Sequence, residues 1–382
     1  MKSGEKSMII DKPKQIDYRF KILYAIAILM VCFGHTGGGV DLFSDWFPYG
    51  GLHLPIFVFS SGYFYRESSE YHVSSYILKK TKRLILPFYA YNIVYGCIVQ
   101  ILKLFGFEIG GQLSFDNIFI SPILHGHQFV YNLGGWFVIP LFMVEIVNIV
   151  VRKQLRICKI EAPEELLFIL SIILGIFGNQ LSIWGYNTKW WLPLVRMLYF
   201  IPFYEFGIFF YKRLEQYESR IPCFNLFAGI FFIKFIIAYY CGRMPTYNPV
   251  WCDDFTEGPI LPIIIGYLGI AFWMRIATVL QPVIGNSKWI NLLAENTYSI
   301  MMNQFLGFML VKVIFALFCK YNLGFFDFDL NSFKTNIWYY YIPRNSHYSL
   351  TIYVVVGIVF SIIVQNILDY IKKFIYNLSV AQ

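Results

Sequence analysis

The chain has 382 residues, of which 57% are hydrophobic and only 14% are charged, and its mean hydropathy is +0.55. A soluble domain carries about 25% charged residues, so this composition excludes a protein that faces water on all sides. The formal charge of +8 is divided among short basic clusters between apolar runs, which is typical of membrane topology and excludes a nucleic-acid surface.

Apolar runs long enough to cross about 30 Å of hydrocarbon predict about ten transmembrane helices. These segments lie near residues 22–36, 49–65, 84–102, 135–151, 165–183, 191–211, 223–241, 259–275, 292–318 and 349–369. We therefore predict an all-α fold, a polytopic transmembrane helical bundle that forms one domain over residues 1–382. The first apolar run has no signal-peptidase pattern after it, so we expect an uncleaved span that follows a basic cytoplasmic segment, residues 1–21.

Basic residues indicate the orientation of the predicted bundle. If the N-terminus is cytoplasmic, most of the 31 Lys and Arg residues fall on inner segments, and most loop acids fall on outer ones. This bias predicts that the N-terminus and the C-terminus both lie inside. Seven cysteines are scattered without a C-x-x-C pair, so we expect neither a zinc site nor any other metal site.

Several ionisable residues fall within the predicted spans, where each is costly and needs an explanation. They are His35, His53, Glu145, Arg196, Glu205, Lys234 and Lys312. Lys312 is interpreted as a lysine that snorkels to the interface. Arg196 and Glu205 are nine residues apart and must point to other helices or to a wet cavity. Glu145 would pair with a cation such as Arg196 or Lys234. A structural ion pair and a functional role remain equal alternatives for these acids.

His35 is the clearest candidate for a catalytic residue. It lies 14 residues beyond Lys21, about 21 Å along a helix, which places it in the outer half of the membrane. Three glycines follow it, so the helix is expected to end there and let a substrate approach. His53 begins the second span at a similar depth. A neutral imidazole is the usual general base near pH 7, although a histidine at a membrane end, taken alone, is more often structural or interfacial.

On the predicted inner side, a basic run at residues 79–83 leads into the third span. Together with Arg19 and Lys21, this run could bind a phosphorylated donor from the cytoplasm. Inner topology alone would also explain such a cluster.

Six segments in order resemble the acyltransferase-three family of membrane acyltransferases. The resemblance is carried by Ile16-Asp17 with residues 25–36, which end in His35-Thr36, and by residues 53–64, 82–87, 135–142, 201–207 and 296–303. The second segment begins His53-Leu54-Pro55, and the fourth contains Trp136. No single motif is highly specific, but together they span nearly the whole chain.

The resemblance implies transfer of an acyl group, usually acetyl, from cytoplasmic acyl-CoA to a hydroxyl of a glycan or a lipid-linked sugar. It implies that His35 is catalytic and that basic residues near the inner face bind the donor. On this basis we expect Glu145, Glu205 or an outer-loop acid such as Asp45 to assist His35. The donor would contact Lys21, Tyr24, Lys82 and Arg83. The acceptor would contact Asp45, His53, Trp136, Arg196 and Asn303.

Two positions depart from the pattern of the resembled family. Many members carry an arginine 11 residues before the histidine, where this chain has Tyr24, and Lys21 on the same helix face is a candidate substitute. A late histidine of the family corresponds here to Asn303. These departures leave altered donor binding or lost activity open.

The sequence thus predicts a multi-pass enzyme of a bacterial inner membrane that uses acetyl-CoA as a substrate and holds no permanent cofactor. We expect its partners to be the lipid bilayer and a glycan or lipid-linked sugar, with no nucleic acid. Homo-oligomerisation is left open. The alternatives are a transporter or exporter whose buried charges line a pathway, and a non-catalytic partner in polysaccharide assembly.

Overall fold

The computed structural model describes residues 16–36, 52–323 and 327–380. Its helices, in chain order, are α1 (Tyr18–Gly34), α2 (His53–Tyr63), α3 (Val73–Lys80), α4 (Leu86–Leu104), α5 (Ser121–Leu124), α6 (Val138–Ile157), α7 (Glu164–Ile183), α8 (Trp191–Phe209), α9 (Glu215–Glu218), α10 (Cys223–Cys241), α11 (Leu261–Ile284), α12 (Lys288–Glu295), α13 (Thr297–Lys320), α14 (Leu330–Thr335) and α15 (Leu350–Val380). The predicted all-α fold is confirmed for this part of the chain.

Among the described residues, eight helices are long and apolar enough to cross a membrane. The other two predicted spans correspond to α1, with 17 residues, and α2, with 11. The predicted count of about ten therefore fits only roughly. Helix α2 is shorter than the expected 49–65, of which residues 49–51 lie outside the described residues.

Three predicted boundaries were wrong. The third span is one continuous helix over Val73–Leu104, so the basic run at its inner end is helical and not a loop. Asn296 separates α12 from α13 within the predicted 292–318. The last helix continues to Val380 because its final turns, which contain Asp369 and Lys372, need not be apolar once they leave the hydrocarbon.

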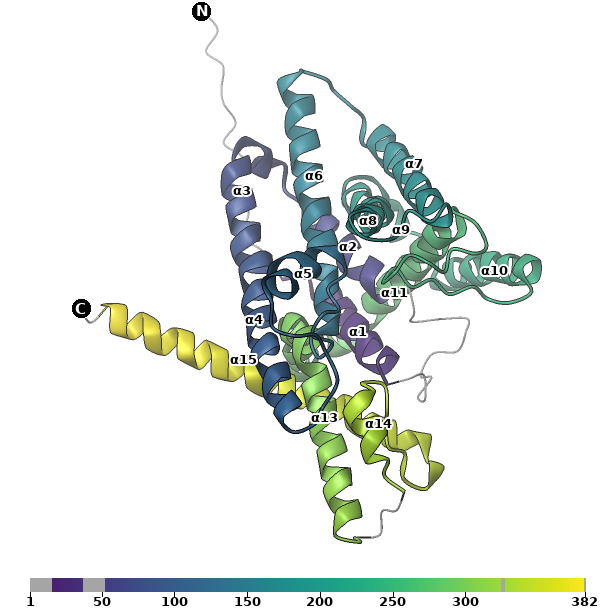
Figure 1. Ribbon diagram of the computed structural model, residues 1–382. Coiled ribbons are helices and arrows are strands. Elements are labelled where there is room, and N and C mark those ends of the chain that lie inside the picture. Colours follow the sequence, from purple (N-terminus) through teal and green to yellow (C-terminus); the bar gives the residue numbers. More distant parts are fainter. Residues whose placement is uncertain (1–15, 37–51, 324–326, 381–382) are drawn as a thin grey trace, which may run out of the picture.

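The short helix α1 lies at the centre of the bundle and packs against α2, α11, α12 and α13. Figure 1 shows α10 at the periphery and α15 projecting away from the other helices. Within α1, ten residues from Phe20 to Phe33 are buried, so the helix that ends next to His35 is enclosed by protein over most of its length.

Ion pairs join segments that the sequence places on the inner side. Arg19 of α1 contacts Glu215 at 2.6 Å, and Arg275 of α11 contacts Glu218 at 2.6 Å. Lys212 contacts Glu164 at 2.5 Å. These contacts place the ends of α1, α7, α9 and α11 together at one end of the bundle, as the predicted topology requires.

The backbones of α2 and α8 are in close contact at two glycines. A Cβ atom on Gly62 would lie 1.9 Å from the carbonyl oxygen of Tyr204, and one on Gly207 would lie 2.0 Å from that of Phe59. Small residues allow such close approach between membrane helices, where dispersion forces replace the hydrophobic drive for association. The two glycines therefore set the position of α2, which carries His53 and Ser61.

We predict that Gly62→Leu destabilises the protein by more than about 3 kcal/mol, because neither backbone can move to admit the side chain. Thermal unfolding in detergent, followed by size-exclusion chromatography, would measure the loss. Gly229→Ala is the control, because no heavy atom lies within 4 Å of the added Cβ there. A Gly62→Leu variant as stable as the control would contradict the close packing of α2 on α8.

Candidate functional site

A cavity of about 1920 Å³ lies inside the bundle. Its wall includes residues of α1, α2, α3, α4, α6, α13 and α15. Lys82, Arg83 and Lys372 line its inner end, and His35 and His53 line its outer part. One continuous space therefore connects the inner basic residues to the histidine at the end of α1.

The cavity brings together most of the residues that the sequence singled out. Its lining includes Lys21, Tyr24, His35, His53, Lys82, Arg83, Trp136, Glu145 and Asn303. Arg196 and Glu205 are not among the lining residues, and Asp45 lies outside the described residues. The residues come from helices far apart in the chain, so only the tertiary fold gathers them.

His35 follows α1 directly, and its backbone N–H donates to the carbonyl of Val31 at 3.2 Å. The imidazole packs against Phe305, with ring centroids 4.9 Å apart, and faces Trp338 at 6.0 Å. Its Nδ1 atom is buried, and no group of the described chain hydrogen-bonds to it. A buried polar atom without a partner is rare and calls for an explanation. A ligand hydroxyl would satisfy it.

His35 also has polar neighbours. The side chain of Gln304 lies within hydrogen-bonding reach of the ring, and His53 is near enough to interact with it electrostatically. Asn303, one residue before Gln304, accepts a hydrogen bond from the Tyr95 hydroxyl at 2.9 Å and donates to the Ser299 carbonyl at 2.8 Å. Asn303 is therefore held rigidly in the cavity wall.

The inner half of the cavity contains a buried ion pair. Glu145, which is 1% exposed, accepts a 2.5 Å contact from Lys80 and a hydrogen bond from the Ser61 hydroxyl. The expected partners Arg196 and Lys234 were therefore wrong, because α3 places Lys80 beside α6. The second oxygen of Glu145 is buried without a hydrogen-bond partner in the described chain.

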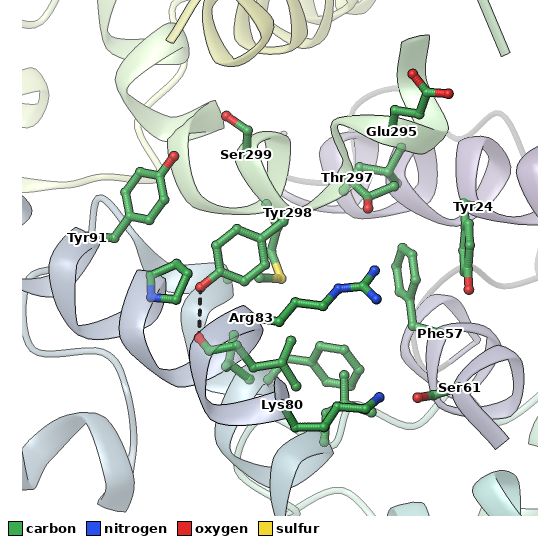
Figure 2. A pocket seen from close by; sticks show the side chains of 18 of the residues that line it. Tyr24, Phe57, Ser61, Lys80, Arg83, Tyr91, Glu295, Thr297, Tyr298 and Ser299 are labelled. Carbon is green, nitrogen blue, oxygen red and sulfur yellow. Dashed lines mark hydrogen bonds between the residues drawn. The ribbon is translucent and has the colours of Figure 1, made fainter. Parts of the chain in front are cut away.

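Arg83 extends into the space between Tyr298 and Phe57, toward Tyr24 (Figure 2). Its guanidinium interacts electrostatically with the Tyr24 hydroxyl, and no carboxylate of the described chain pairs with it. Lys21, the expected substitute for the missing arginine, contacts Glu295 at 2.8 Å instead. Arg83 therefore presents an unneutralised positive charge beside the position of Tyr24.

Arg196 lies behind the cavity wall and not in the cavity. Its guanidinium stacks over Trp136 at 4.4 Å and donates to the backbone carbonyls of Val250 and His125. These contacts hold the loops that contain His125 and Val250 near Trp136. Trp136 and Val250 line the cavity. Burial, and then the charge of Arg196, lower the pKa of His127 to about 3, so that this loop histidine is neutral.

Glu205 belongs to an ion-pair network at the inner end of the bundle. It contacts Arg152 at 2.8 Å, and Arg152 also contacts Glu164 at 3.0 Å. Glu205 is engaged in this network and does not line the cavity. Its contacts connect α8 to α6 and, through Arg152, to α7.

The end of α1 is covered by a segment that contains Ile337 and Tyr340, which the sequence did not single out. The Tyr340 hydroxyl donates to the backbone carbonyl of His35. Lys312 donates to the Ile337 carbonyl at 2.6 Å and lies 4.5 Å from the Tyr340 ring centroid. Lys312 is 3% exposed, so the expectation that it snorkels was wrong. Nothing in the pattern of residues 327–349 signalled that this segment folds back onto α1.

Within the described residues, no group of three or more His, Cys, Asp or Glu side chains is arranged to hold a metal ion. The lining of the cavity offers the imidazole of His35, the Lys80–Glu145 ion pair and the guanidinium of Arg83.

The model of the acyltransferase domain family matches residues 17–365, nearly the whole chain. The chain therefore belongs to this acyltransferase family, the acyltransferase-three family, and the resemblance noted in the sequence is confirmed. It is a multi-pass membrane acyltransferase. Comparisons with curated proteins and with solved structures gave no match.

We predict that Glu145→Gln lowers the free energy of unfolding by about 2 kcal/mol, because it leaves the Lys80 charge in the cavity without its partner. Removing both charges, in Lys80→Met with Glu145→Gln, should restore most of that stability. Thermal unfolding of purified protein measures both effects.

Glu165→Gln serves as a matched control, since Glu165 is half-exposed and pairs with Arg213 at the surface. Such exposed pairs contribute about 0–1 kcal/mol. Equal losses in the Glu145 and Glu165 variants would contradict the buried pair.

Proposed function

We propose that the protein transfers a small acyl group, acetyl in the simplest case, from cytoplasmic acyl-CoA to a hydroxyl of a surface polysaccharide or a lipid-linked sugar. The observation that supports this proposal is the continuous cavity between Arg83 and His35. A donor whose phosphates bind at the inner end can extend its flexible arm through the bundle. Its thioester then reaches the imidazole.

In the proposed reaction, His35 is the general base. The acceptor hydroxyl gives its proton to the imidazole as its oxygen attacks the thioester carbonyl carbon. The new carbon–oxygen bond forms an ester, the carbon–sulfur bond breaks, and the departing thiolate takes up a proton, so that CoA leaves as the thiol. The unpartnered Nδ1 and the nearby Gln304 amide support this role.

In the proposed donor site, Arg83 binds a phosphate group of CoA. A guanidinium matches phosphate geometry with two parallel hydrogen bonds, and it is strongest where no carboxylate competes. Lys80 and Lys21 both contact carboxylates, whereas Arg83 contacts none in the part of the chain that the structure describes. This arrangement supports Arg83 as the substitute for the arginine that many family members carry at the position of Tyr24. Lys82, exposed beside it, adds positive charge.

Membership of an acyltransferase family weighs against the transporter hypothesis, because the cavity and its charges have a catalytic explanation. A non-catalytic partner in polysaccharide assembly would have no need for the imidazole of His35. The variants below therefore separate that alternative from the enzyme.

We predict that His35→Ala lowers acyl transfer by at least about a hundredfold, the usual contribution of a general base. The measurement is ester content of extracted cell-surface glycan in cells with the wild-type gene, the variant and no gene. Ile173→Ala, at an exposed position on α7, is the control and should match the wild type. Normal ester content with folded His35→Ala would refute the catalytic role.

We predict that Arg83→Gln raises the KM for acetyl-CoA by about tenfold, which corresponds to one lost charge-assisted hydrogen bond to phosphate. Arg213→Gln is the matched control, since Arg213 is exposed at the same end of the bundle and pairs with Glu165. Membrane vesicles with radiolabelled acetyl-CoA give both constants. An unchanged KM in Arg83→Gln would move the donor site elsewhere.

A further inference from the structure

Trp338 packs close to His35 but is outside the cavity lining. The two ring centroids are 6.0 Å apart, and Trp338 is not among the described residues that line the cavity. His35 itself does line it. The imidazole therefore borders both the cavity and the indole.

The indole is a large apolar surface open to the outside. Trp338 is 45% exposed, although its neighbours Phe305 and Ile337 are buried. An open aromatic face costs solvation free energy, and such faces in proteins commonly mark a binding surface. Interfacial tryptophans of membrane proteins are also exposed, so exposure alone does not separate a binding surface from a membrane anchor.

The contacts that hold the indole in place distinguish a binding surface from a membrane anchor. Phe305 meets the Trp338 ring edge-to-face at 5.6 Å, and the Trp338 backbone N–H donates to the side chain of Asn336 at 2.9 Å. The residues on either side of it are tied to two helices: Lys312 of α13 donates to the Ile337 carbonyl, and Tyr340 donates to the His35 carbonyl at the end of α1. A membrane anchor needs only depth, whereas these contacts fix the indole relative to His35.

From this geometry we propose that Trp338 is the platform on which a sugar ring of the acceptor stacks. This inference rests on the proposed function and assigns the acceptor a carbohydrate face. The C–H face of a pyranose packs on an indole, and its hydroxyls then project from the ring edge. With the two rings 6.0 Å apart, one such hydroxyl can reach the imidazole. The donor arrives from the cavity and the acceptor from the opposite side, so the two substrates need not share an entrance.

Kinetics in membrane vesicles test the platform. The donor is radiolabelled acetyl-CoA, and the acceptor is de-esterified cell-surface glycan purified from cells that lack the gene. Trp338→Ala is expected to raise the KM for glycan about tenfold, from the loss of one aromatic contact, while the KM for acetyl-CoA stays within twofold. Trp338→Phe keeps a ring and is expected to recover most of the loss.

Trp184→Ala is the matched control, because Trp184 is 62% exposed at the end of α7 and serves neither substrate in this scheme. A glycan KM within twofold of wild type in Trp338→Ala overturns the platform and leaves the proposed function intact. Equal changes in both KM values, or no recovery in Trp338→Phe, also overturn it, since they indicate a general distortion around His35. A wild-type enzyme that transfers no label to glycan refutes the proposed function and the platform together.

Discussion

The requirement that a charge within a membrane be neutralised governs this structure. Arg152 meets two carboxylates, Arg196 meets two backbone carbonyls and the face of Trp136, and Lys312 meets the carbonyl of Ile337. Each contact also joins segments that are distant in the chain, so neutralisation and assembly are achieved by the same bonds. Arg83 differs because it faces a cavity where water or a ligand can solvate it. The unneutralised charge of Arg83 therefore points to the cavity as the candidate functional site.

The short central helix α1 places His35 where both the cavity and the segment around Tyr340 meet it. With 17 residues, α1 is shorter than the eight long apolar helices, and His35 follows its last residue and does not lie in its middle. The cavity approaches this end from the inner side, and the segment containing Trp338 and Tyr340 covers it from the other. The carbonyl at the end of α1, which lacks an intrahelical partner, is satisfied by Tyr340. The Tyr340 hydrogen bond thus caps the end of α1 and positions His35 at the same time.

The two residues that depart from the family pattern have distinct surroundings. Arg83 points toward Tyr24 and interacts with it electrostatically. A positive charge is therefore still present near this position, but another segment supplies it. Asn303 is held by Tyr95 and Ser299, with all its bonds directed to neighbouring side chains and backbone. An amide cannot carry a proton as a histidine does, so proton transfer in the proposed reaction falls to His35 alone. The pattern departures alter how the site is assembled and leave its imidazole in place.

The sequence by itself determined the all-α class, the approximate number of apolar segments and the family, and it singled out His35 as a candidate, because hydropathy, helix length and local motifs are carried by contiguous residues. It also placed nine of its site residues on what proved to be one cavity. It misassigned the partner of Glu145 and the state of Lys312, and it did not single out Trp338 or Tyr340. Those contacts join residues tens to hundreds of positions apart, and a membrane helix can rotate to offer any face to its neighbours. Only the packing of α3 on α6, and the return of residues 336–341 to the end of α1, decided which charges are paired and which surfaces meet His35.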